Sequence, residues 1–167
     1  MKKIQLTRKS FAIVDDDDYE RLSKHKWFCN YYGYACRTES YPRINGKQKK
    51  KNILMHREII DCPVGKDTDH QDGNKLNNQK ANLRICNRRM NNANLPKRKN
   101  CSSKYKGVTW NKQIKKWCAQ TTSEDNKHLH LGTFLKEEDA AKAYDKKARE
   151  LFGEFARCNY SDSPVVE

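Results

Sequence analysis

Asp69 and His70, adjacent near the middle of this 167-residue chain, are the residues with the clearest chemical potential. A carboxylate can bind a divalent cation, and a neutral imidazole can take a proton from water. Hydrolysis of a phosphodiester needs both functions at one phosphorus atom, because a cation must neutralise the phosphate and the leaving oxygen while a base activates water. The pair therefore indicates a candidate site for metal-assisted hydrolysis.

The backbone around this pair must meet a geometric condition. Neighbouring residues of a regular strand point to opposite faces, so Asp69 and His70 can share a site only where their strand ends or bends. The run Asp72-Gly73-Asn74 is a turn signal that begins two residues later. We therefore expect the pair at the end of a strand, directly before a turn.

A second strand and a helix are expected downstream. A short strand is predicted at 83–86, and Asn87 can cap a helix that carries Asn91 one turn further on. The amide oxygen of Asn91 can complete a site for a hard cation such as Mg²⁺. The alternative interpretation is an Asn-rich loop that caps its own turns, with His70 as an ordinary surface histidine.

The segment from Met55 to Asn91 resembles the HNH homing endonucleases of bacteriophages. Their ββα-metal unit carries an Asp-His-x-Asp-Gly-Asn run, an Asn-Leu-Arg run and then a helical polar ligand, and this chain has them at 69–74, at 82–84 and at Asn91. The resemblance implies that Asp69 and Asn91 bind one Mg²⁺ or Mn²⁺ per active site. It also implies that His70 is the general base and that Asn82 buttresses the loop and orients His70.

The last position departs from the commonest pattern of that family. Many HNH nucleases have a histidine where Asn91 stands, so this chain resembles the H-N-N variant, and modest metal affinity is expected. His56 has two interpretations, a structural or phosphate-contacting role or a direct part in catalysis. Arg57 and Arg84 are candidate DNA-phosphate contacts, and equally candidate partners in surface ion pairs.

The charge of the chain points to a polyanionic partner. It has 35 Lys and Arg against 21 Asp and Glu, a net charge of +14, and the excess is spread along the whole chain. Such a surface attracts nucleic acid, and double-stranded DNA is the expected partner. An anionic membrane surface, RNA, or a merely soluble surface are the alternatives.

Other features of composition bear on location and redox state. No apolar stretch approaches the ~18 residues of a membrane span, and no signal peptide is recognisable. The seven cysteines form no CxxC pair, which favours free thiols in a reducing cytoplasm over a structural zinc site. If the gene is phage-encoded, that cytoplasm belongs to a bacterial host cell.

The C-terminal segment reads as a small sheet followed by a helix. Three strands are predicted near 104–110, 116–122 and 127–133, and a helix at 137–152, where alanines and aromatics recur at helical spacing. Acidic residues open this helix and Gly153 ends it. Residues 103–160 resemble the plant ethylene-response-factor (AP-two) DNA-binding domain, through the runs Tyr105-Lys106-Gly107-Val108, Lys116-Trp117, Leu131-Gly132-Thr133-Phe134 and Ala140-Ala141-Lys142-Ala143-Tyr144-Asp145.

That resemblance implies a three-stranded sheet laid in the major groove, with the helix on its back. The candidate DNA contacts on the sheet are Lys106, Trp110, Lys112, Lys116 and Gln120. The plant domains have arginines where this chain has Lys106 and Thr109, and a Trp where it has His130, so their target sequence does not carry over. Trp117 and Phe134 are expected in the core rather than on DNA.

The whole chain is therefore expected to be a monomeric α+β protein without an obligate protein partner. Its parts are a β-rich N-terminal module at 1–52, a ββα-metal nuclease at 53–95, a basic linker at 96–102 and the AP-two-like domain at 103–160. In the N-terminal module a hairpin turn is predicted at Asn45-Gly46, and the aromatics at 27–34 either form a small core or stack on nucleic acid. The expected activity is site-specific nicking of DNA, and a non-catalytic DNA-binding regulator is the alternative.

Overall fold

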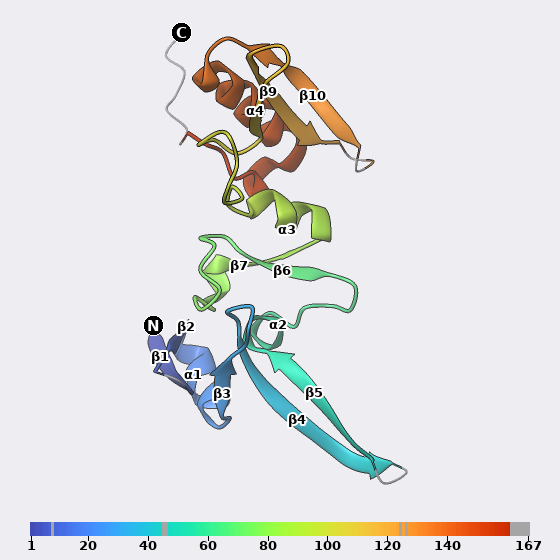
Figure 1. Ribbon diagram of the computed structural model, residues 1–167. Coiled ribbons are helices and arrows are strands. Elements are labelled where there is room, and N and C mark those ends of the chain that lie inside the picture. The colour runs from blue at the N-terminus through green and yellow to red at the C-terminus, as the bar shows by residue number, and fades with distance from the viewer. Residues whose placement is uncertain (8, 45–46, 124, 126, 161–167) are drawn as a thin grey trace. The chain divides into compact units, whose positions relative to one another are not determined.

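A computed structural model of the chain describes residues 1–7, 9–44, 47–123, 125 and 127–160 (Figure 1). The chain divides into two compact units, unit 1 at Met1–Arg88 and unit 2 from Arg89 onward. Both combine sheets with helices, as expected of an α+β protein. Within the described residues no helix is both long and apolar enough to cross a membrane.

Unit 1 is built on a five-stranded sheet of order β2-β1-β3-β4-β5. β1 pairs in parallel with β3, and the other neighbours are antiparallel. The strands are β1 (Lys2–Thr7), β2 (Phe11–Val14), β3 (Trp27–Cys29), β4 (Ala35–Ile44) and β5 (Lys47–Leu54). The turn predicted at Asn45-Gly46 lies outside the described residues.

Helix α1 (Asp16–Ser23) connects β2 to β3. The acidic run at 15–18 forms the start of α1. Three aspartates lie in its first turn, Asp16, Asp17 and Asp18, where the helix dipole favours negative charge.

One hydrophobic core joins the N-terminal strands to the segment that carries the candidate site. Alternate residues of β1 and β2 point into it, and residues of α2 and β7, which are far away in sequence, pack against them. The buried members of this core are Ile4, Leu6, Ala12, Val14, Leu22, Trp27, Ala35, Met55, Ile59 and Leu83. Trp27 is buried, and its indole N–H donates to the backbone oxygen of Leu22. Tyr31 and Tyr32 are exposed, so the core explanation holds for Trp27 and is wrong for these two tyrosines.

The candidate site lies on short elements after this sheet. Helix α2 (Met55–Ile59) is followed by β6 (Asp67–His70), the 3₁₀ turn η1 (Lys80–Asn82) and β7 (Leu83–Cys86), and β6 pairs antiparallel with β7. β7 has the predicted bounds. Helix α3 (Arg88–Asn94) begins directly after Asn87 and ends before Pro96, as the sequence signals indicated.

The loop between β6 and η1 is attached to the N-terminal sheet. The backbone N–H of Ile13 in β2 donates to Leu76 O at 2.8 Å, and the N–H of Asn78 donates to Ile13 O at 2.7 Å. Asp15 accepts two further hydrogen bonds, from Gln79 Nε2 and from the N–H of Lys80. The N-terminal residues therefore belong to the same structural body as the loop.

Unit 2 contains an antiparallel three-stranded sheet of order β10-β9-β8. Its elements are β8 (Val108–Asn111), β9 (Lys116–Thr122), β10 (His128–Phe134), helix α4 (Glu137–Phe152) and the 3₁₀ turn η2 (Gly153–Phe155). The second strand and the helix have the predicted bounds. The first strand begins at Val108 rather than near residue 104, because Ser103 Oγ and the N–H of Lys104 donate to Glu137 and Gly107 has a φ of +75°, so the chain turns here.

Helix α4 packs on one face of this sheet, as the sequence predicted. Small residues allow the close approach: Ala119 of β9 and Val108 of β8 form a core with Ala140 and Ala141 of the helix. Trp117 and Phe134 pack against this core, which confirms the expectation for both. The opposite face carries polar side chains at alternate positions, and we call it the open face. Register places on it Thr109, Asn111, Lys116, Cys118, Gln120, Thr122, His128, His130 and Thr133.

Candidate active site

Asp69 is a buried carboxylate at the end of β6. It is 4% exposed and lies opposite Arg84 in the β6–β7 ladder. The Arg84 guanidinium, 11% exposed at its side chain, forms an ion pair with Asp69, and its Nε is 3.1 Å from Asp69 Oδ2. Of the two interpretations of Arg84, the structure therefore supports the ion pair, and the pair is buried rather than on the surface.

His70 follows Asp69 and is also buried, at 5% exposure. Its Nε2 lies 3.4 Å from Oδ1 of Asn78, whose own Nδ2 donates to Leu76 O. Since an amide oxygen only accepts, Nε2 carries the ring proton and Nδ1 is the accepting nitrogen. Burial lowers the pKa of His70 despite opposing contributions from Asn78, Asp72 and Asp69, so the ring is neutral near pH 7.

Two aromatic rings contact His70. The His56 ring, from α2, meets it edge-on with centroids 5.1 Å apart, and the Tyr34 ring lies 5.9 Å from His70 and 5.0 Å from His56. Burial, and then the nearby His70 and Arg57, lower the pKa of His56 to about 3. Burial, and then Asp67 and Asp69, raise the pKa of Tyr34. All three side chains are therefore uncharged at neutral pH.

The turn after His70 is held by a hydrogen-bonded group that we call the Asp72 network. Asn82 Nδ2 donates to Asp72 Oδ1 at 3.0 Å and to Asn77 O at 2.8 Å, and the N–H of Asp72 donates back to Asn82 Oδ1 at 3.0 Å. Burial acts to raise the pKa of Asp72, but hydrogen bonds from Asn77, Asn74 and Asn82 outweigh it and the pKa is lowered. Asn82, the last residue of η1, thus ties the segment before β7 to the turn that follows Asp69 and His70.

Arg57 and Lys75 lie near this region with different partners. Arg57 donates to three backbone oxygens of the loop after α2, those of Cys62, Pro63 and Lys66, at 2.7–3.1 Å. Its guanidinium therefore braces a loop. Lys75 donates to Tyr32 O at 3.0 Å and lies 4.7 Å from the centroid of the Tyr34 ring.

Asn91, the remaining expected metal ligand, lies on α3 in unit 2. Asp69, His70 and Asn82 are brought together within unit 1, whereas the participation of Asn91 stays a prediction. Among the described residues, no group of three or more His, Cys, Asp and Glu side chains is arranged to hold a metal ion.

Two of the expected DNA contacts in unit 2 are not on the open face. Lys106 precedes β8, and its Nζ donates to the backbone oxygens of Ala93 and Leu95. Burial, and then Arg157, lower its pKa to about 8. Trp110 pairs with Trp117 across the β8–β9 ladder, with ring centroids 4.9 Å apart, and so lies on the face that α4 covers.

The other three candidates fit a DNA-contacting surface. Lys116 and Gln120 are exposed on the open face, and Lys112 is exposed in the turn between β8 and β9. His128 and His130 lie on the same face, and neither was among the predicted DNA contacts. The alternation of side chains between the two faces of β9 and β10 is the sequence signal that could have placed these two histidines on the open face.

Sequence reasoning also missed three residues around His70. Asn78, fully buried, bonds its ring, and Tyr34 and His56 pack on it. No local pattern marks Tyr34, because it comes from the start of the chain. Asn78 lies within the Asn-rich run, but nothing in the run distinguishes it from its neighbours.

Comparison with known proteins bears on what this arrangement is. HNH endonuclease L560 of Acanthamoeba polyphaga mimivirus, named as uncharacterized, is 35% identical over 156 residues, which cover 92% of this chain and 76% of that protein. The chain belongs to the HNH endonucleases. Protein 3.8 of Escherichia phage T7 is 37% identical over 95 residues, 57% of this chain and 77% of that protein. The AP2 domain model matches residues 103–154 of this HNH endonuclease, which confirms the AP-two resemblance.

Proposed function

We propose that this chain is a metal-dependent DNA endonuclease in which His70 is the general base and unit 2 holds the duplex. Its family, and the neutral buried His70 beside the Asp69 carboxylate, support the proposal. The observation that carries it is the orientation of the imidazole, with Nε2 donating to Asn78 and Nδ1 as the accepting atom. One site per chain makes single-strand nicking the expected outcome.

The two ligands that the family resemblance implies are of the chemical kind that a hard divalent cation prefers. Asp69 would supply a carboxylate oxygen and Asn91 an amide oxygen, and Mg²⁺ commonly uses only one or two protein ligands and keeps its other positions for water. When bound, the cation neutralises charge on the scissile phosphate and on the leaving 3′ oxygen. The guanidinium of Arg84 competes for Asp69, which is consistent with the modest metal affinity expected of an H-N-N variant.

His70 takes a proton from the attacking water at Nδ1. The low pKa keeps this nitrogen unprotonated at neutral pH, and the uncharged His56 and Tyr34 rings add no charge beside it. The hydrogen bond from Nε2 to Asn78 fixes the tautomer of His70 and the orientation of its ring, so that Nδ1 is the nitrogen that accepts the proton. Asn82 acts as a positioning residue, since it holds the turn after His70 through the Asp72 network.

The open face of unit 2 is the proposed DNA surface. Lys116 and Lys112 supply positive charge, and Gln120 can bond base edges or phosphates. Lys106 and Trp110 are left out of this set, because the first donates to backbone oxygens and the second packs against Trp117. Joining this surface to a catalytic unit raises the local concentration of the substrate.

The test is to incubate the full chain with pooled duplex DNA and Mg²⁺ or Mn²⁺, with and without chelator, and to sequence the new ends. His70→Ala should lower nicking by at least about 100-fold, since a general base contributes 10²–10⁴-fold, and should leave duplex binding unchanged. His25→Ala is the matched control, because His25 is an exposed histidine of the same unit.

Two outcomes would contradict the proposal. If wild type binds duplex DNA but cuts nothing under any metal condition, the chain is a DNA-binding regulator built on an HNH scaffold. If RNA displaces the duplex at equal salt, the substrate class is wrong, because both bind through phosphates and differ in shape.

A further inference from the structure

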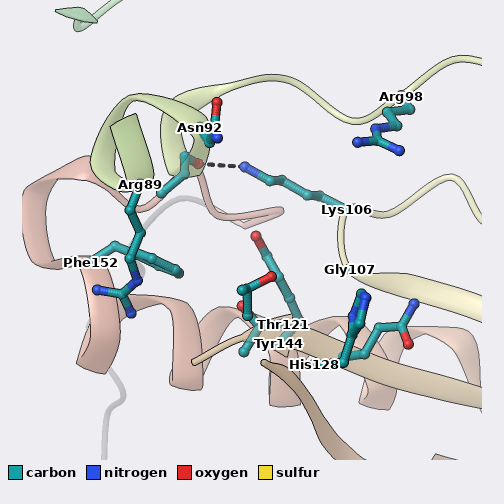
Figure 2. Close-up of a pocket in the computed structure, with 12 residues that line it drawn as sticks. Arg89, Asn92, Arg98, Lys106, Gly107, Thr121, His128, Tyr144 and Phe152 are labelled. Carbon is teal, nitrogen blue, oxygen red and sulfur yellow. Dashed lines mark hydrogen bonds between the residues drawn. The ribbon is translucent and has the colours of Figure 1, made fainter. Parts of the chain in front are cut away.

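Unit 2 contains a pocket that the proposed DNA surface does not use (Figure 2). Its volume is about 350 Å³, and we call it the α3–β9 pocket. It is lined by α3, the segment after it, the turn before β8, the ends of β9 and β10, and α4. Its size lies at the lower end of ligand pockets, and it exceeds what a single water or ion needs.

The lining of this pocket is basic. Arg89, Arg98 and Lys106 reach it from three different segments, His128 and Asn92 add polar nitrogens, and no acidic side chain occurs among the described residues that line it (Figure 2). Arg157 is close enough to contribute to lowering the pKa of Lys106. Positive charges that repel one another without an acidic neighbour favour an anionic occupant.

Arg89 carries the strongest evidence. Its guanidinium lies 4.6 Å from the centroid of the Phe152 ring, which supports it from one side, and Figure 2 shows the two side chains against each other. Its Nε and Nη2 are buried and have no hydrogen-bond partner among the described residues. A buried donor without an acceptor costs free energy, and the planar fork of arginine matches two oxygens of a phosphate.

The pocket is continuous with the open face. Gln120 and His128 belong to the open face and also line the pocket, beside the first β8–β9 pair of Val108 with Ala119. The pocket is therefore within reach of a nucleic-acid strand that would cross the open face along β9.

We propose that the α3–β9 pocket binds the backbone of the DNA strand that lies on the open face, with Arg89 taking one phosphate and Arg98, on the other side of the pocket, taking another. This rests on the DNA-binding half of the proposed function and not on the nuclease half. Lys106 is a positioning residue of this site, because its Nζ joins the carbonyl oxygens of Ala93 and Leu95 and so holds the end of α3 against the turn before β8.

The experiment measures duplex affinity of the full chain by fluorescence anisotropy in chelator, over a series of salt concentrations. Arg89→Gln should weaken binding about tenfold and lower the slope of log K against log salt by about 0.9, the value for one phosphate contact. Arg98→Gln should change the slope in the same direction. The matched control is Lys142→Gln on α4, an exposed cation outside the pocket, which should change neither quantity.

A second measurement follows the side-chain Nε–H resonance of Arg89 in the wild type. Duplex DNA should shift it. If inorganic phosphate shifts it and the duplex does not, the pocket takes a free phosphate and the assignment to DNA is wrong. If Arg89→Gln is folded by circular dichroism and binds with the wild-type slope, the site does not exist. Should that variant not fold, the exposed Arg98 gives the same slope test.

If the wild type does not bind duplex DNA, the proposed function itself is refuted. If the wild type binds the duplex with the expected dependence of log K on log salt but does not nick it, only the catalytic half of the proposed function is refuted. The two proposals therefore fail in different measurements.

Discussion

Two buried aspartates, one in each unit, show how differently a carboxylate can be used. Asp145 on α4 is 2% exposed and accepts from the backbone N–H and Nδ2 of Asn159 and from the backbone N–H of Tyr160, at 2.8–3.0 Å. Asp69 is 4% exposed and is met by the guanidinium of Arg84 beside His70. One carboxylate is bound by uncharged N–H groups, two of them backbone, and the other by a charged side chain.

The difference separates structure from chemistry. Backbone donors are fixed by the chain, so Asp145 joins the C-terminal segment to α4 and cannot exchange partners without local unfolding. A side-chain cation can move away and be replaced by another cation, and a base stands next to Asp69. A buried carboxylate with an exchangeable partner beside a neutral imidazole is therefore the better candidate for function.

The largest expected effect comes from Asp69, the aspartate beside His70. Asp69→Asn should lower nicking by about 100-fold or more, a typical loss when one electrostatic contact to a reacting phosphate is removed. The measurement is single-turnover nicking of a labelled duplex in Mg²⁺, with circular dichroism as the check on folding. Asp145→Asn is the matched control. If Asp69→Asn and Asp145→Asn lose nicking equally, both aspartates act only by stabilising the fold, and the proposed role of Asp69 in the reaction is wrong.

Asp145 should affect stability instead. Asp145→Asn replaces an acceptor oxygen by a donor facing other donors, and should cost about 2–3 kcal/mol of unfolding free energy. Urea denaturation of the full chain measures it. Asp139→Asn, an exposed aspartate on the same helix, should cost less than about 1 kcal/mol. A loss at Asp145 no larger than at Asp139 would refute the structural role.

The third expected effect is a pH dependence of stability at His56. Its pKa in the folded chain is about 3 against 6.5 for the unfolded chain, so only the unfolded chain takes up this proton between these values. Stability should therefore fall as pH drops from 6.5 toward 3, by at most about 1.4 kcal/mol per pH unit. His56→Gln should flatten that part of a urea-denaturation profile, and His25→Gln should not. Parallel profiles for wild type and His56→Gln would contradict the assigned burial.

The parts of the fold with a strong local pattern could be predicted. α4 and β9 were predicted with their bounds, because alanines at helical spacing and alternating residues report the face that each element buries. The position of Asp69 and His70 at the end of β6 followed from the turn residues after them. These are short-range signals, which a single sequence contains.

What could not be predicted depends on contacts between distant residues. The packing of Tyr34 and His56 on His70 brings together the residue before β4, helix α2 and strand β6. No periodic pattern in the sequence relates these three segments. The ion pair of Arg84 with Asp69 depends on strand register. Lys106 looked like a DNA contact, but its amine donates to carbonyl oxygens. The place of Trp110 on the face that α4 covers could have been predicted, because Trp110 is two residues from the buried Val108 and such residues of a strand share a face.

The hydrogen bonds between Ile13 and the loop at Leu76 and Asn78 also limit how this enzyme can be shortened or recombined. A minimal fragment that starts at residue 53 would remove the strand against which that loop is paired, and with it the support of the amide that bonds His70. Exchange of gene segments at this point would likewise separate two parts that need each other. The first strands and the nuclease segment should therefore be inherited together, whatever DNA-binding domain follows them.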